Sequence, residues 1–417
     1  MASLSVNGAN AQMSSSILFG DLPSLLSTEE THKDNVFGIG VRVSNNFDDN
    51  ALNDSRAKRA NVLTIMEPHF QWSGSRSRAE WSLSYSPGYS LSHPLAVYSS
   101  QSQHFDASIQ WKPLKRLKVQ LQNNFLESTN PFDRLGLLET TPGATGIDQP
   151  NISSATSARA RSEQMALGLM YATSTHGVVG AKSSWFNVNY SGIGESQGLG
   201  SARSITEQLF YSHHLTRRQW VGLQYSLQDL NAHNPTSHAL VHSLFYTHAV
   251  RLGPNMVFSW FAGPQHTAFR TDSVSAVTSS IHPRQHWAGG ATYSWTWDHD
   301  SISAGFSRRI TDGAGLTGIA RLSTAYTELR HEITQRWSAD MLVSYDHSKT
   351  LATGPNVLAY VSGACGLTHM LTRGVSLEVR YWRVHEWSSG TRPGSYFADH
   401  NRISTSLQYD FQGRLGR

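Results

Sequence analysis

Residues 402–411 read RISTSLQYDF, a stretch in which apolar and polar side chains alternate up to a final phenylalanine. Successive side chains of a β-strand point to opposite faces, so this stretch predicts a strand with one apolar face and one polar face. Segments of the same design recur over residues 36–411. An apolar face along about ten residues, repeated in many segments, is typical of strands with lipid on one side and water on the other.

The composition excludes membrane-spanning helices and agrees with membrane-spanning strands. The chain has 417 residues, of which 15% are charged and 10% are aromatic, and its mean hydropathy is -0.37. No segment approaches the roughly 18 uninterrupted apolar residues that a transmembrane helix needs. No proline-rich, glycine/serine-rich or charged linker divides the chain, which predicts one continuous architecture.

The connections between the expected strands alternate in length. Short links such as 112–115 and 298–300 follow every second strand, whereas long polar links such as 126–161 and 263–283 separate the others. Short turns on one rim and long loops on the other predict an all-β, transmembrane up-and-down antiparallel β-barrel with both termini on the short-turn side. Alternation and turn residues together indicate about 18 strands, with about 16 as the alternative count.

The placement of aromatic residues supports the same prediction. Trp72, Trp111 and Trp297 precede short turns, Trp220 follows one, and Tyr190 lies near the opposite end of its strand. Tryptophan and tyrosine favour the membrane boundary, where the apolar ring and the polar N–H or O–H each find a suitable medium. We therefore expect two aromatic belts. A soluble β-sandwich or propeller is the alternative, but strands of soluble sheets are commonly only about five or six residues long.

The sequence divides into three expected parts. Residues 1–35 are expected to form an N-terminal segment that combines a signal-peptide remnant with a flexible tail, because Ala9-Asn10-Ala11 fits the small-residue cleavage pattern of secretory signals. A chance occurrence of this triplet in a flexible tail is the alternative. Residues 36–411 are expected to form the barrel, and residues 412–417 a C-terminal tail.

With these features the chain resembles the bacterial outer-membrane β-barrel superfamily, and general porins most closely in plan. In that superfamily the last strand ends in an aromatic residue that the barrel-assembly machinery recognises, and Tyr409 and Phe411 look like this signal. The chain departs from the pattern because it continues beyond Phe411. The resemblance implies a location in the bacterial outer membrane, contact with outer-membrane lipid, and a homotrimer like that of porins.

The resemblance also draws attention to the longest connection. In general porins the third external loop folds into the lumen and narrows the pore, and here the third external connection, residues 127–161, is the longest. The resemblance therefore implies a constriction loop, with the charged candidates Asp133, Arg134, Glu139 and Asp148. A surface lid is the alternative, because no residue pattern fixes the direction of this loop.

Alternation predicts which charged residues face the lumen. If Trp81, Leu83 and Tyr85 face lipid, the residues between and beside them face inward. The same rule gives a set of pore-lining candidates: Glu80, Asp106, Lys118, Asp340, Glu378, Arg380 and Arg402. Charged side chains in a water-filled pore tune ion preference, and opposite charges on neighbouring strands also pair and brace the wall. Both roles stay open for each residue.

The histidines and the cysteine do not indicate a metal site. His213 and His214 point to opposite faces of a regular strand, and His238 and His242 lie roughly 13 Å apart along one face. Cys365 is the only cysteine, so neither an intrachain disulfide nor a cysteine-based zinc site is expected. We expect no metal and no cofactor.

The sequence does not indicate an enzyme or a nucleic-acid-binding protein. It contains no His-Glu-x-x-His and no phosphate-binding glycine loop, and no catalytic residue is assigned. The formal net charge is +4, and the basic residues are scattered rather than gathered in a stripe. We therefore expect a porin-like channel for passive diffusion of small polar solutes. The alternatives are a closed or plugged barrel acting as a structural or polysaccharide-export component, and an adhesin that presents its external loops.

Overall fold

The computed structural model describes residues 35–51, 58–94, 100–128, 159–191, 201–233, 236–271, 282–311, 319–351, 357–389 and 396–414. Within these residues the chain forms one sheet of 18 strands, each antiparallel to the next along the sequence. The last strand pairs with the first, so the sheet closes into a barrel. No described helix is both long and apolar enough to cross a membrane.

The strands are 12 to 19 residues long, well above the usual length in soluble sheets. In chain order they are β1 (Val36–Asp48), β2 (Asn61–Arg76), β3 (Ala79–His93), β4 (Ser100–Leu114), β5 (Leu117–Ser128), β6 (Arg159–Ala172), β7 (Gly177–Ser191), β8 (Ala202–Thr216), β9 (Gln219–His233), β10 (Thr236–Gly253), β11 (Met256–Thr271), β12 (His282–Thr296), β13 (Asp300–Thr311), β14 (Ala320–Thr334), β15 (Trp337–Thr350), β16 (Val357–Thr372), β17 (Val375–Ser389) and β18 (Tyr396–Arg414).

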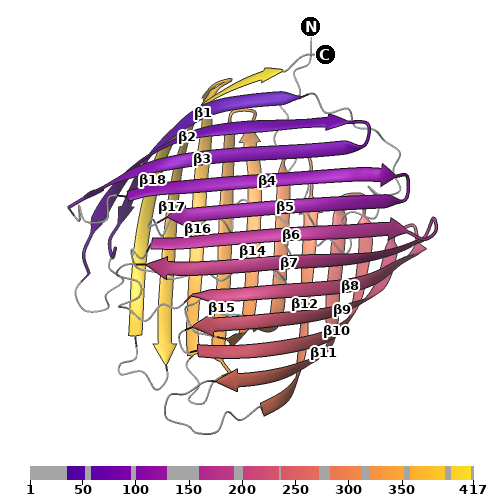
Figure 1. Cartoon of the computed structure of the whole chain (residues 1–417). Helices are drawn as coiled ribbons and strands as arrows, with labels where there is room; N and C mark the ends of the chain where they lie inside the picture. The colour runs from indigo at the N-terminus through magenta and orange to yellow at the C-terminus, as the bar shows by residue number, and fades with distance from the viewer. Residues whose placement is uncertain are drawn as a thin grey trace.

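Figure 1 shows the early strands crossing one side of the barrel wall and β14 to β18 passing behind them. The start of β1 and the end of β18 lie at the same rim, because Val36 pairs with Arg414. The turns that join β2 to β3, β4 to β5 and β16 to β17 contain two residues each. The prediction of an all-β, up-and-down barrel with 18 strands is therefore confirmed.

Two predicted boundaries differ from the structure. β18 continues beyond Phe411, since residues 412–414 pair with residues 36–38 of β1. β11 runs through Gly263 and Pro264, where the sequence predicts the start of a loop. Proline lacks an N–H group, and the ladder with β10 is interrupted at these two residues while pairing with β12 continues. A one-sided gap of this kind accommodates the proline without ending the strand.

The curvature of the wall separates two chemically different faces. On the seam strands Ile39, Leu407 and Phe411 point outward and are 50%, 48% and 58% exposed. Ser44 and Ser406 point inward and are only 4% and 3% exposed. Side chains on the convex face diverge, whereas those on the concave face converge and cover one another. The exposed apolar side chains form the surface that meets lipid in a barrel of this class.

The two predicted aromatic belts form only in part. Trp72, Trp111 and Trp297 point outward and are 42%, 50% and 59% exposed. The prediction is wrong for Trp220 and Tyr190, which are 8% and 4% exposed. Both occupy inward positions of their strands, and Trp220 packs in an apolar cluster with side chains from β6, β7, β8 and β10. Nearness to a turn does not by itself give the face to which a ring points.

A buried ion pair joins the first and last strands at the long-loop rim. Arg402 Nε lies 2.9 Å from Asp48 Oδ2, and His400 Nδ1 lies 3.3 Å from Asp48 Oδ1. The backbone N–H of Asn50 donates to the same carboxylate at 2.9 Å. The Asp48 and Arg402 side chains are 4% and 8% exposed. This carboxylate therefore links the two edges of the sheet where little water screens the charges.

We expect Asp48→Asn to lower the free energy of unfolding by about 3 kcal/mol or more, because it removes the negative charge that faces the buried Arg402 guanidinium. Thermal unfolding of the detergent-solubilised barrel, followed by circular dichroism, measures this loss. Asp399→Asn is the matched control, since Asp399 lies 2.6 Å from His385 on the exposed outer face of β18. The control should cost less than about 1 kcal/mol. Equal losses for the two variants would contradict the structural role of Asp48.

Candidate luminal site

Charged side chains from β15, β17 and β1 meet on the inner face of the barrel. Arg380 Nη2 lies 3.1 Å from Asp340 Oδ2, and Arg380 Nε lies 3.0 Å from Glu378 Oε1 as an ion pair. Glu378 Oε2 in turn lies 3.4 Å from Arg42 Nη2. The contact between Glu378 and Arg42 crosses β18 and therefore depends on the closure of the barrel.

Two residues of β14 extend this group. Arg330 lies opposite Asp340 in the register of β14 and β15, and Glu328 accepts a hydrogen bond from Ser303 Oγ at 3.4 Å. The Arg380 side chain is 13% exposed and the Arg42 side chain 39%. We name this group the charged strip, and its members are Arg42, Glu328, Arg330, Asp340, Glu378 and Arg380.

An inward-facing glycine makes room for the central pair of the charged strip. Gly366 of β16 lies opposite Asp340 of β15 and opposite Arg380 of β17. A Cβ atom at position 366 would lie 2.5 Å from Asp340 Oδ1 and 3.0 Å from Arg380 Nε. Glycine therefore lets two side chains that are two strands apart meet above the strand between them.

A second pair repeats this arrangement across β1. Asp410 of β18 and His69 of β2 both lie opposite Gly40 of β1. His69 Nε2 lies 2.5 Å from Asp410 Oδ1, and Gln408 Nε2 donates to Asp410 Oδ2 at 2.9 Å. A Cβ atom at position 40 would collide with the imidazole ring of His69. A glycine on the intervening strand is thus common to both luminal pairs.

The pore-lining candidates from the sequence all occupy inner-face positions, but they do not form one group. Asp340, Glu378 and Arg380 belong to the charged strip. Glu80 and Asp106 lie apart from the charged strip on β3 and β4, where Asp106 accepts hydrogen bonds from side chains of β3 and β5.

Two of the candidates, Lys118 and Arg402, point inward but are almost fully covered, so their contact with the lumen stays a prediction. Lys118 is 1% exposed and lies opposite Met170 of β6, and Arg402 is 7% exposed and engaged with Asp48 at the seam. Alternation gives the face to which a side chain points. It does not give the depth to which neighbouring side chains cover it on a concave surface.

The constriction-loop candidates Asp133, Arg134, Glu139 and Asp148 lie outside the described residues. The connection predicted as 127–161 is shorter at both ends, because β5 continues to Ser128 and β6 begins at Arg159. Whether this connection enters the lumen stays a prediction.

Acidic side chains are unevenly distributed around the inner wall. Among the described residues, inward-facing acids occur on β1 to β4 and on β14 to β18. Acids of β6 to β13 point outward instead, and they are Glu163, Glu207, Asp229 and Asp300. Amides such as Gln208 and Gln224 occupy inward positions on that side. Within the described residues, the inward carboxylates therefore lie on one half of the wall.

Sequence reasoning does not single out Arg42, Glu328 or Arg330, although alternation places each of them inward. A charged residue at an inward position of a strand is a signal that the sequence does contain. The ion-pair partner of such a residue cannot be predicted from the sequence, however, because Arg42 and its partner Glu378 are 336 residues apart. Gly366 gives no signal beyond its inward position, since its role depends on the two neighbouring strands.

The histidine pairs are arranged as alternation predicts. His214 stacks on the inward-facing Trp220 with ring centroids 4.9 Å apart, whereas His213 lies on the outer face beside Tyr211. His238 and His242 have separate partners, since His238 Nε2 lies 2.9 Å from an aspartate of β9 and His242 Nδ1 lies 2.7 Å from a tyrosine of β9. No group of three or more metal-ligating side chains assembles within the part of the chain that the structure describes.

The proposed assembly signal lies on the outer face of the last strand. Tyr409 and Phe411 point outward and are 50% and 58% exposed. Contact of these side chains with the barrel-assembly machinery stays a prediction. Cys365 is also exposed, at an outward position of β16.

One Gly-x-Ser-x-Gly sequence, GESQG at residues 194–198, occurs between β7 and β8. These residues lie outside the described part of the chain. A nucleophile elbow places this motif on a turn from a strand to a helix, whereas here the motif connects two antiparallel strands. The motif therefore does not change the expectation that the protein is not an enzyme.

We expect Gly366→Ala to cost about 1–3 kcal/mol of unfolding free energy, because the added methyl group displaces the Asp340 carboxylate from a charged hydrogen bond. Gly363→Ala on the same strand is the matched control, since a Cβ atom there meets nothing within 4 Å. Chemical unfolding in denaturant measures both variants. In an Asp340→Ala background the loss of unfolding free energy caused by Gly366→Ala should largely vanish. An unchanged loss would show that Gly366 does not serve to make room for the Asp340 carboxylate.

No family model and no curated protein matches this sequence. The fold is similar to that of solved structures at low sequence identity. The structure of Pseudomonas aeruginosa OccK2 (OpdF) is 10% identical, with 91% of this chain and 99% of that chain covered and a TM-score of 0.46. The structure of Pseudomonas aeruginosa OpdK with vanillate is 10% identical, with 91% and 99% covered and a TM-score of 0.47.

The siderophore receptor PirA from Pseudomonas aeruginosa is also 10% identical, with 92% of this chain and 81% of that chain covered and a TM-score of 0.40. Scores of this size assign no substrate to this chain. Its own geometry is sufficient for the architecture, because a closed antiparallel sheet of 18 strands with an exposed apolar outer face spans outer membranes. The chain is a closed up-and-down β-barrel of 18 strands with the exposed apolar outer face of a membrane-spanning barrel.

Proposed function

We propose that the protein is a channel through which small polar solutes diffuse passively across the outer membrane. The charged strip carries this proposal, because its side chains line the inner face and stay partly exposed, as Arg42 does at 39%. Barrels of about 16 to 18 strands are wide enough to hold an aqueous lumen. Partly solvated charges on the inner wall are what a water-filled path would contact.

The balance of charge suggests which solutes pass most readily. The charged strip contains three carboxylates and three guanidinium groups, and Arg380 contacts both Asp340 and Glu378. A balanced set of this kind stabilises both ends of a polar or zwitterionic solute and favours neither cations nor anions strongly. We therefore propose weak ion selectivity that single substitutions shift in either direction.

Single-channel recording of the refolded barrel in a planar bilayer tests this proposal, and discrete current steps are expected. Asp340→Asn should lower the cation-to-anion permeability ratio by roughly a factor of two, because a unit charge about 8 Å from an ion in water contributes about 0.5 kcal/mol. Arg380→Gln should shift the ratio in the opposite direction. The reversal potential in a salt gradient measures both shifts.

Glu207→Gln is the matched control, since it removes the same charge from the outer face of β8, where Glu207 accepts a hydrogen bond from Ser183 at 2.7 Å. This variant should leave the reversal potential unchanged. A folded barrel that stays silent, both intact and with residues 135–158 deleted, would contradict the channel and favour a closed structural or export barrel. A shift with Glu207→Gln as large as that with Asp340→Asn would contradict the assignment of the charged strip to the ion path.

A further inference from the structure

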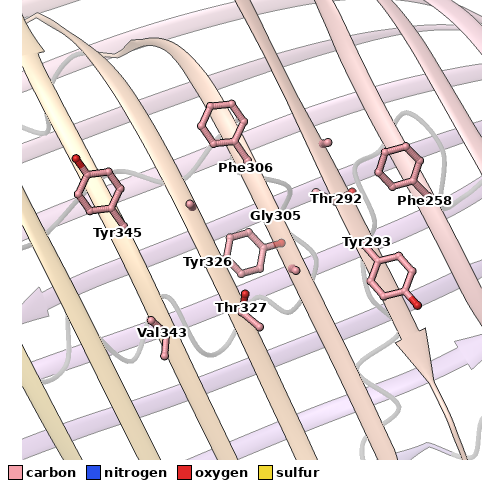
Figure 2. A pocket seen from close by; sticks show the side chains of 12 residues that line it. Phe258, Thr292, Tyr293, Gly305, Phe306, Tyr326, Thr327, Val343 and Tyr345 are labelled. Atoms are coloured by element: carbon pink, nitrogen blue, oxygen red, sulfur yellow. The ribbon is translucent and has the colours of Figure 1, made fainter.

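An apolar groove of about 430 Å³ lies on the outer wall of the barrel across β11 to β15. Figure 2 shows the rings of Phe258, Tyr293, Phe306 and Tyr345 around this groove, each carried by a different strand. Small outward residues separate the rings, namely Ala291, Ala304 and Ala325. The groove forms because large and small side chains alternate across the strands. Tyr293 lies opposite an alanine of β13, and Phe306 lies opposite an alanine of β14.

Three outward cations lie on the external side of the groove, and we name Arg308, Arg321 and Lys349 the basic patch. Arg308 is two residues beyond Phe306 on β13, and Lys349 is four residues beyond Tyr345 on β15. Arg321 of β14 lies directly opposite Lys349 in register, and Arg308 is its diagonal neighbour. Opposite positions on one face have Cβ atoms about 5 Å apart and diagonal positions about 7–8 Å apart. The three side chains therefore reach a common anion.

No described acid offsets the charge of the basic patch. Across β12 to β16 the only described acid at an outward position is Asp300, at the short-turn end, where it lies 2.6 Å from His331. Among the described residues, no ion pair involves a member of the basic patch. Elsewhere on the outer face cations do have acidic partners, as Arg159 has in Glu127 and His238 has in Asp229.

Together the groove and the basic patch are complementary to an amphipathic anion, which has an apolar chain and a negatively charged group. An apolar chain fits between the rings at membrane depth, and a negatively charged group fits above the rings at the external boundary. Among the described residues these three cations have no acidic partner, and cations on a barrel wall are costly unless negative charge lies nearby. The phosphates of a lipid in the outer leaflet supply it at the right height.

We propose that the outer wall of β11 to β15 binds one phosphorylated glycolipid of the outer leaflet, of the lipopolysaccharide class, with a phosphate on the basic patch and an acyl chain in the groove. This inference rests on the outer-membrane placement of the barrel and not on conduction through it. A second copy of this chain is the other candidate occupant of an exposed groove, and the measurements below separate the two.

Native mass spectrometry of the full chain in detergent, titrated with purified diphosphorylated lipid A, tests the proposal. We expect one tightly retained lipid A per barrel. The triple variant Arg308→Gln, Arg321→Gln, Lys349→Gln should weaken retention by about a hundredfold, because three cations near a lipid phosphate are removed together. The matched control is the triple variant Arg159→Gln, Arg161→Gln, Arg203→Gln, which removes the same charge from exposed outward positions of β6 and β8.

A groove variant tests the apolar half of the site independently. Ala325→Phe fills the space between the rings and should also weaken retention, whereas Ala107→Phe makes the same change at an outward position of β4, away from the groove, and should not. Dephosphorylated lipid A should bind weakly, and inorganic phosphate alone should not compete at equal concentration.

Equal retention by the two triple variants would overturn the assignment of the basic patch. Full competition by inorganic phosphate would show a simple anion site without a lipid. Dimers that disappear with Ala325→Phe, with no lipid retained by the original chain, would overturn the proposal in favour of a second copy in the groove. Circular dichroism of each variant confirms that the barrel has folded before retention is compared.

Discussion

The pairing of β1 with β18 is the constraint on which the rest of the structure depends. In the hydrocarbon layer no water satisfies exposed N–H and C=O groups, so an open sheet would leave a row of unpaired groups along each edge. The first and last strands remove both edges by pairing from Val36 and Arg414 to Asp48 and Arg402. The ladder ends where the side chains of Asp48 and Arg402 form their buried ion pair.

Closure also gives the wall its curvature, and curvature determines how deeply the side chains on each face are covered. Inward side chains converge, so even polar ones such as Ser406 are almost fully covered. Charges on this crowded face need counter-ions from the protein itself, and the charged strip supplies them across strands. Gly366 and Gly40 permit these pairs, because a side chain on the intervening strand would occupy the same space. The inner wall is therefore braced and charged by the same residues.

The outer face differs, because its side chains diverge and its large apolar side chains are exposed, as on the lipid-facing surface of membrane barrels. Outward charges near the external rim pair within the protein in several places, such as Arg159 with Glu127. The basic patch of Arg308, Arg321 and Lys349 is different, since no described acid lies near it. We propose that a lipid phosphate provides the counter-ion that the described residues do not. The two faces of one sheet thus differ in where their counter-charges come from.

The sequence by itself determined the strands, their number and the face to which nearly every side chain points. These properties follow from local alternation with a period of two residues and from the contrast between short turns and long connections. They place Glu80, Asp340 and Glu378 on the inner face and Tyr409 on the outer face without reference to any other strand. Alternation also gives the inward direction of Trp220, which its nearness to a turn obscures.

Only the tertiary structure decided which side chains meet and how deeply they are covered. Lys118 and Arg402 are inward but buried, and Arg42 finds Glu378 across a separation of 336 residues. The role of Gly366 and the grouping of the basic patch likewise depend on register between strands. Register and closure are set by the pairing of all 18 strands together, whereas alternation within one strand carries no information about the side chains opposite it.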